Sequence, residues 1–84
     1  MKKYIIKDSF GNIKIIYANN LSHALKVYDS CIVKVDNDYI MQSDRPEMTS
    51  LKKYAKIFSS EQEARDYARK YFRLKSSDIE IIRG

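Results

Sequence analysis

The amino-acid sequence predicts one small α+β domain spanning residues 1–84, a two-layer α/β sandwich with two helices on one face of a mixed or antiparallel sheet. Three observations predict this class. Short β-rich runs alternate with two segments whose apolar residues recur at helical spacing. The β-rich runs alternate apolar and polar residues, which is typical of a sheet with one open face. No linker or low-complexity tract divides the chain, and its length fits a single core. The expected order is ββαβ(β), a loop, then βαβ.

The chain begins with a predicted β-hairpin. Residues 3–7 (KYIIK) and 13–18 (IKIIYA) are rich in residue types that favour strands. The intervening DSFGN contains Gly11, which readily adopts the positive φ that a tight hairpin loop requires. We therefore expect two antiparallel strands joined at this loop.

A helix is expected next, within the segment ANNLSHALKVY. Its apolar residues with spacing i, i+3, i+4 and i+7 are Leu21, Ala24, Leu25 and Tyr28. Asn19 or Asn20 is placed to cap the N-terminus of this helix. Residues 31–35 (CIVKV) alternate as a strand, and the DND at 36–38 has turn chemistry before a short strand at 39–41.

The middle of the chain is predicted to be a loop, residues 42–50 (QSDRPEMTS). Asp44 and Glu47 flank Pro46, a pattern that favours a brief capped helical turn. Residues 53–58 then alternate as a strand.

The second helix has the strongest local signals in the sequence. Ser60 and Glu63 have the spacing of a capping box, and the first turn is acidic. Its apolar face consists of Ala64, Tyr67, Ala68, Tyr71 and Phe72. Its last turn is basic, as the helix dipole favours. Residues 78–83 (DIEIIR) are expected to close the chain as a strand.

Composition limits the environment and the assembly. A single cysteine excludes an internal disulfide, and neither a signal sequence nor an 18-residue apolar run is present. The sequence therefore indicates a cytoplasmic protein with no membrane contact. Because 84 residues bury only a small core, a homodimer or a complex with another tight partner is kept as an alternative to a stand-alone monomer.

Residues for catalysis, for metal binding or for a cofactor do not form a recognised pattern. His23 and Cys31 are each the only residue of their type, too few for a zinc site without carboxylates. Asp36, Asp38 and Glu47 match three calcium-loop positions, but Met41 stands where glycine is required. With only two glycines, the chain lacks a phosphate-cradling loop. We therefore expect no enzyme, no catalytic residues, no metal and no cofactor.

Residues 51–75 hold eight basic and three acidic residues, so their net charge of +5 equals that of the whole chain. Helical spacing pairs Glu61 with Arg65 and Asp66 with Lys70, which accounts for part of this charge. On the sheet side, alternation directs Lys52, Tyr54 and Lys56 to the open face, unless Tyr54 and Phe58 form the buried pair instead. The other strands are expected to add Lys3, Ile5, Lys7, Lys14, Ile16, Ile32 and Lys34 to that face. The predicted binding residues are Lys14, Lys34, Lys52, Tyr54, Lys56, Arg69, Arg73 and Lys75.

Two functions from different classes follow. The first is a non-catalytic regulatory protein that contacts a nucleic acid or a nucleoprotein assembly through this basic surface. The alternative is a protein-directed inhibitor or adaptor, of the type encoded by phages and mobile elements, that uses an exposed Ile/Tyr/Lys sheet face. A basic pocket for a small anionic metabolite between two protomers is a third reading with less support.

Overall fold

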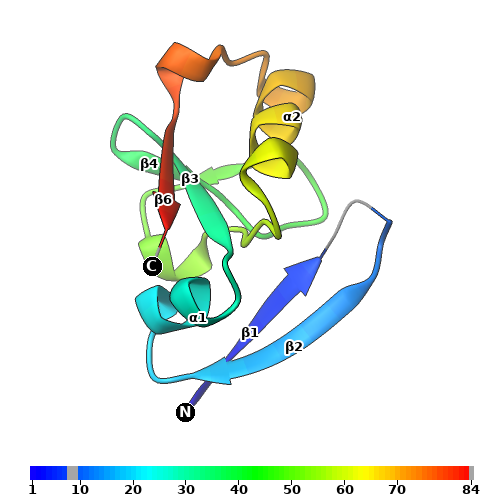
Figure 1. Ribbon diagram of the computed structural model, residues 1–84. Helices are drawn as coiled ribbons and strands as arrows, with labels where there is room; N and C mark the ends of the chain where they lie inside the picture. The colour runs from blue at the N-terminus through cyan, green and yellow to red at the C-terminus, as the bar shows by residue number, and fades with distance from the viewer. Residues whose placement is uncertain (8–9, 84) are drawn as a thin grey trace.

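The computed structural model describes residues 1–7 and 10–83, and it confirms the predicted α+β class (Figure 1). The strands form two antiparallel sheets and not the single sheet expected from the sequence. The first sheet is a hairpin of β1 (Lys2–Lys7) and β2 (Ile13–Ala18), and it is followed by α1 (Leu21–Val27).

The second sheet has four strands in the order β5–β4–β3–β6. These strands are β3 (Cys31–Val35), β4 (Asp38–Ile40), β5 (Met48–Thr49) and β6 (Glu80–Arg83). The remaining elements are α2 (Glu61–Phe72) and two short 3-10 turns, η1 (Lys52–Tyr54) and η2 (Ser76–Asp78).

The pairing of β1 with β2 and the β3–β4 turn form as predicted, and residues 8–9 of the predicted hairpin loop lie outside the described residues. Gly11 has a φ of +84°, which glycine adopts without the strain that a Cβ brings. Asp36, in the tight turn between β3 and β4, also has a positive φ of 54°. Aspartate tolerates this conformation better than most residues, which explains the turn chemistry read from the sequence.

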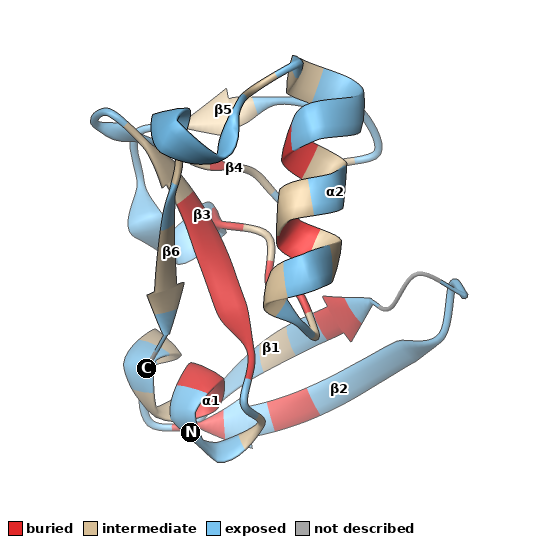
Figure 2. Ribbon diagram, turned by 45° about the horizontal axis from the view of Figure 1, so that its top comes forward, coloured by how far each residue is buried: buried red, intermediate tan, exposed pale blue. Residues whose placement is uncertain are grey.

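Strand β3 is the centre of the molecule because both of its faces are buried (Figure 2). Ile32 belongs to a core cluster with the hairpin and α1. Its neighbours Cys31 and Val33 point the other way and belong to a cluster with α2. The two helices therefore pack on opposite faces of β3, and the expectation of both helices on one face is wrong.

Both helices begin at the residues that the sequence indicates. The Asn20 side chain accepts a hydrogen bond from the backbone N–H of His23, at 2.8 Å. The Ser60 hydroxyl accepts one from the backbone N–H of Glu63, at 3.2 Å. Each cap satisfies a donor that the first helical turn leaves unpaired.

Glu61, in the first turn of α2, ties that helix to β6. Its carboxylate accepts hydrogen bonds from Arg65, four residues on, and from Arg83 in β6, both at 2.8 Å. The hydrogen bond from Arg65, followed by that from Arg83, lowers the pKa of Glu61. The predicted Glu61–Arg65 pair is therefore confirmed, and Arg83 adds a long-range partner.

The predicted strand at residues 53–58 is wrong. Lys52–Tyr54 form the η1 turn, and Ala55, Ile57 and Phe58 then make three isolated bridges with three different partners. Ala55 pairs with Met41, Ile57 with Ile6, and Phe58 with Cys31. The segment runs between the two sheets and pairs with residues of both, so it does not form a continuous ladder with either.

The brief helical turn predicted between Asp44 and Glu47 is also wrong. The chain bends there and then forms β5, which pairs with β4. The backbone N–H of Met41 donates to the carbonyl of Glu47, so this segment is held by sheet-type contacts. Among the described residues, no helix is both long enough and apolar enough to cross a membrane.

Candidate anion-binding surface

Four lysines line one open hollow of about 500 Å³ between the hairpin, the start of α1 and η1. They are Lys2, Lys3, Lys52 and Lys53. The other lining residues are Tyr4, Asn20, Leu21 and Ser22, so no acidic side chain lines the hollow. None of the four lysines makes an ion pair within residues 1–7 and 10–83. We call this feature the lysine hollow.

The register of the backbone explains why these lysines meet. Ile6 and Ile57 pair in a parallel bridge, so β1 and the segment that follows η1 run side by side in the same direction. The lysine pair at the start of β1 therefore lies near the lysine pair in η1, although fifty residues separate them. Both isoleucines are buried, which anchors the two segments in the core.

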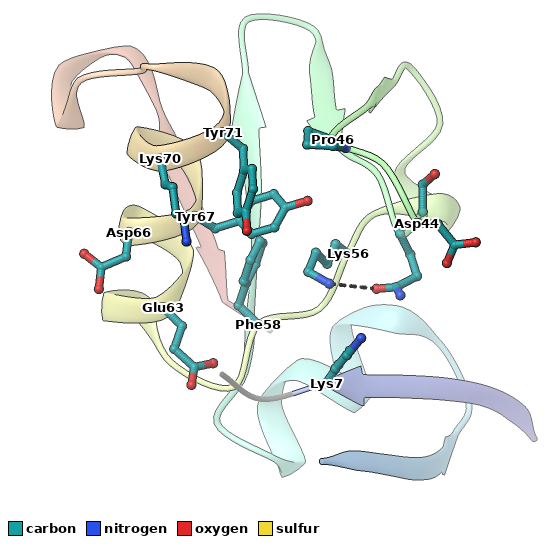
Figure 3. A pocket seen from close by; sticks show the side chains of 12 residues that line it. Lys7, Asp44, Pro46, Lys56, Phe58, Glu63, Asp66, Tyr67, Lys70 and Tyr71 are labelled. Atoms are coloured by element: carbon teal, nitrogen blue, oxygen red, sulfur yellow. Dashed lines mark hydrogen bonds between the residues drawn. The ribbon is translucent and has the colours of Figure 1, made fainter. Parts of the chain in front are cut away.

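A second hollow, of about 520 Å³, lies between α2, the 42–46 loop and the end of β1 (Figure 3). We call it the aromatic cleft, because Phe58, Tyr67 and Tyr71 form one of its walls. The rings pack on one another, with Tyr67 centred 5.3 Å from Phe58 and 4.6 Å from Tyr71. Three lysines also line the cleft: Lys7, Lys56 and Lys70.

Lys56 is a half-buried cation in this cleft. Its ammonium lies 5.5 Å from the centre of the Tyr67 ring and 5.8 Å from that of Phe58. The amide oxygen of Gln42 accepts a hydrogen bond from it at 3.5 Å (Figure 3). Burial, followed by the nearby charge of Lys7, lowers the pKa of Lys56. Two aromatic rings and an amide thus flank the Lys56 ammonium. The neighbouring charge that affects it most is that of Lys7, which is also positive.

The acidic residues around the cleft are engaged elsewhere or lie at its rim. Asp66 accepts hydrogen bonds from Gln62 and Arg69, and Figure 3 shows its carboxylate pointing away from the aromatic rings. Glu63 accepts a hydrogen bond from the Ser59 hydroxyl. Asp44 is exposed on the loop opposite α2. The cleft is therefore of mixed charge, and two of its lysines, Lys56 and Lys70, lie over aromatic rings.

The outer face of the hairpin is apolar and exposed. The face alternates along β1 as Lys3, Ile5 and Lys7, and β2 places Tyr17, Ile15 and Ile13 opposite them in that order. Ile5 is 41% exposed, Ile15 49%, Tyr17 60% and Ile13 64%. Figure 2 shows β2 as mostly exposed, with two buried bands that face the core. No described element covers these four side chains.

The open sheet face predicted from the sequence is only partly correct. Lys3, Ile5 and Lys7 are exposed as expected, but Ile16 and Ile32 are 1% and 0% exposed and belong to the core. The expectation failed for these two because the hairpin and the four-stranded sheet pack against each other. Their two faces therefore do not join into one surface.

The structure separates the predicted binding residues. Lys52 lines the lysine hollow and Lys56 lines the aromatic cleft. Tyr54 is half exposed, with the Lys53 ammonium 5.0 Å from its ring centre. Lys14 lies over the Tyr28 ring, at 4.8 Å.

The other predicted residues lie outside both hollows. Lys34 is half-buried in β3, between Tyr39 of β4 and Glu80 of β6. Arg73 ends α2 in a left-handed conformation, and Lys75 is the exposed residue before η2. Arg69, expected to be free, pairs with Asp66 at 2.9 Å.

Two details of α2 were also mispredicted. Asp66 pairs with Arg69 and not with Lys70, because the i, i+3 position also brings an arginine within reach. Lys70 lies over the ring of Tyr71 at 5.3 Å. Tyr71 was expected in the core, yet it is 48% exposed, because it lies near the end of the helix and borders the cleft.

Sequence reasoning missed Lys2, Lys53 and Lys70 as members of these hollows. The pairing that joins β1 to the 55–58 segment is long-range and parallel, and nothing in the local sequence specifies it. The adjacent pairs Lys2-Lys3 and Lys52-Lys53 were the available signal.

Cys31 and His23 make no contact with each other that would form a nucleophile pair. The Cys31 thiol donates to the Ser60 carbonyl at 3.6 Å, and the Nδ1 of His23 accepts from the backbone N–H of Asn19 at 3.4 Å. Burial raises the pKa of Cys31 to about 11, so the thiol stays protonated at neutral pH. Within the described ranges, no group of three or more His, Cys, Asp or Glu residues gathers as metal ligands would.

Comparison of this chain with protein-family models, with curated proteins and with solved structures finds no match.

Proposed function

We propose that the protein is a non-catalytic binder of nucleic acid, or of a nucleoprotein assembly, that contacts the phosphate backbone through the lysine hollow. The observation that carries this proposal is the meeting of four lysines in one concave site with no acidic lining residue. Phosphate groups are the abundant cellular anions that such a site fits.

Electrostatics supports the proposal. Four like charges in one hollow repel each other, and a concave surface concentrates their field. A polyanion that enters relieves the repulsion and releases its own counterions, which is the main source of sequence-independent binding. Lysines that only keep a protein dispersed are usually interspersed with acidic residues, unlike these four.

Binding of a fluorescently labelled oligonucleotide, measured across a salt series, tests the proposal. We expect the logarithm of the binding constant to fall linearly with the logarithm of salt concentration between about 50 and 200 mM. For a single strand, each phosphate contact contributes about 0.7 to the slope. Four contacting lysines therefore predict a slope of about −2.8 or steeper. No binding to DNA or RNA at about 50 mM salt would overturn the proposal.

A second candidate function is a protein-directed inhibitor or adaptor, and the exposed outer face of the hairpin favours it. Exposed isoleucines and a tyrosine that face solvent together are typical of interaction surfaces. The partner would offer an apolar patch bordered by acidic residues, to match Lys3 and Lys7. We expect such a complex to survive nuclease and high salt and to be lost on Ile15→Asp, whereas glutamine at Lys2, Lys52 and Lys53, which lie off this face, should leave it intact.

A further inference from the structure

Lys3 and Lys7 connect the two hollows along one face of one strand. They are four residues apart in β1 and therefore point to the same side of it. Lys3 lines the lysine hollow and Lys7 lines the aromatic cleft. At about 3.3 Å per strand residue, the two positions are about 13 Å apart.

The surface between these lysines is the apolar outer face of the hairpin. Ile5 lies between them in β1, Ile15 is its partner in β2, and Tyr17 is the partner of Lys3. Such directly opposed side chains on one face are in contact range, so they form a continuous strip. The strip has cations at both ends and an aromatic ring at one of them.

We infer that a single-stranded nucleic-acid segment of a few nucleotides crosses this face, with phosphates in both hollows and unstacked bases against Tyr17 and Ile15. At about 3.4 Å per nucleotide of a stacked strand, about four nucleotides span the distance between Lys3 and Lys7, and an unstacked strand, which is longer per nucleotide, spans it with fewer. The inference rests on the proposed function and adds to it the strandedness of the ligand and the path that it follows.

The chemistry of the face favours a single strand over a duplex. Bases in a duplex are stacked on each other, so they do not offer their faces to a protein surface. An unpaired strand offers both of the groups that the hairpin can bind, phosphates for the lysines and base faces for the apolar strip. Sequence preference is expected to be weak, because every base has a face that can stack.

Charge also argues against a second copy of this chain on the same face. The described strands β1 and β2 contain no acidic residue. A self-dimer through this face would therefore bring the lysines of two copies together without a compensating charge, which is unfavourable.

Lys56 strengthens the case for a phosphate in the aromatic cleft. Among the neighbouring charges, that of Lys7 has the largest effect on the half-buried Lys56 ammonium, and it lowers the pKa of Lys56. A phosphate bound between Lys7 and Lys56 would neutralise this pair and raise the pKa of Lys56. The remaining charged or titratable groups that line the cleft are Asp44, Glu63, Asp66, Tyr67, Lys70 and Tyr71.

The test compares oligothymidylates of two and eight nucleotides with an eight-base-pair duplex, using the full chain. We expect the eight-nucleotide strand to bind more tightly than the duplex and far more tightly than the dinucleotide. Lys7→Gln/Lys56→Gln should reduce the salt slope for the eight-nucleotide strand by about 1.4, at 0.7 per lost contact. Tyr17→Ser should weaken binding about tenfold, and Tyr17→Phe should not. Val27→Ser, at an exposed position of α1, is the matched control.

The outcomes separate the inference from the proposed function. If the wild-type chain binds, but equally to duplex and single strand or with an unchanged slope in Lys7→Gln/Lys56→Gln, the inference fails and the function stands. If Tyr17→Ser keeps full oligonucleotide affinity, the bases do not use this face and the inference likewise fails. If the same Tyr17→Ser variant no longer binds a protein that the wild type binds, the outer face of the hairpin is a binding surface for that protein. If the wild-type chain binds no oligonucleotide at about 50 mM salt, both are overturned.

Discussion

Ile6 of β1 and Ile57 pair in a parallel bridge, and this register determines which lysines become neighbours. The two isoleucines are 5% and 3% exposed and share one core cluster with Ile16 and Leu25. Because the two segments run in the same direction, the pairs Lys2-Lys3 and Lys52-Lys53 meet in the lysine hollow at one end. Lys7 and Lys56 line the aromatic cleft at the other end. The binding surface therefore depends on a core contact.

Ile57→Ala should destabilise the fold by about 2–4 kcal/mol, because it removes buried methyl groups and leaves a cavity. Ile15→Ala, on the half-exposed outer face of the hairpin, should cost less than about 1 kcal/mol. Urea unfolding followed by circular dichroism measures both. Equal losses in the two variants would show that residue 57 does not anchor the core.

Ser60→Ala should lower the free energy of unfolding by about 1 kcal/mol, because the N-terminus of α2 loses the acceptor for the Glu63 N–H. For a chain of this size, that corresponds to a fall in Tm of about 4–8 °C. Ser60→Asp, which keeps an acceptor at the cap, should retain most of the stability. If Ser60→Asp melts as low as Ser60→Ala, the cap is not the cause.

Glu61→Gln should lower the Tm at pH 7, and the difference from the wild type should shrink in acid. Hydrogen bonds from Arg65 and Arg83 hold the pKa of Glu61 below its ordinary value of 4.5. A carboxyl whose pKa is lowered by folding stabilises the fold above its unfolded pKa, and this contribution disappears as the pH falls through the folded pKa. Thermal melts between pH 7 and about pH 2 measure the effect. Glu47→Gln, the same substitution at an exposed loop position, is the matched control.

Cys31 should resist alkylation in the folded protein at pH 8. The side chain is 1% exposed, and burial raises its pKa to about 11 from an ordinary 9.0. That difference alone lowers the thiolate fraction about a hundredfold, and burial restricts access further. Mass spectrometry should show rapid labelling with iodoacetamide only in denaturant. Rapid labelling of the native chain would contradict the burial of the Cys31 side chain of β3 against α2.

The elements that could be predicted from sequence are those with local causes. Gly11 in the hairpin loop, Asn20 and Ser60 as caps, and the Glu61–Arg65 pair all depend on residues within a few positions of each other. Local sequence specifies such features because the contacts that make them are themselves local.

The arrangement that builds the candidate site depends on distant pairings, which local patterns do not encode. Residues 55–58 alternate like a strand, but they divide their bridges among Met41, Ile6 and Cys31. Ile32 looks like an exposed position of a one-sided strand, but β3 is covered on both faces. As a result, Lys52 was recognised as a candidate binding residue, whereas its meeting with Lys2, Lys3 and Lys53 in one hollow was not.

The measurement that tests the central proposal most directly compares two variants of equal net charge. Lys2, Lys3, Lys52 and Lys53 are replaced by glutamine in one variant, and Lys14, Lys26, Lys34 and Lys75, which line neither hollow, in the other. Both changes reduce the formal charge from +5 to +1, so only the position of the charge differs. If the lysine hollow holds the phosphates, the first variant loses most oligonucleotide affinity and up to about 2.8 of the salt slope, and the second keeps most of both. Equal losses in the two variants would mean that net charge, and not this hollow, attracts nucleic acid.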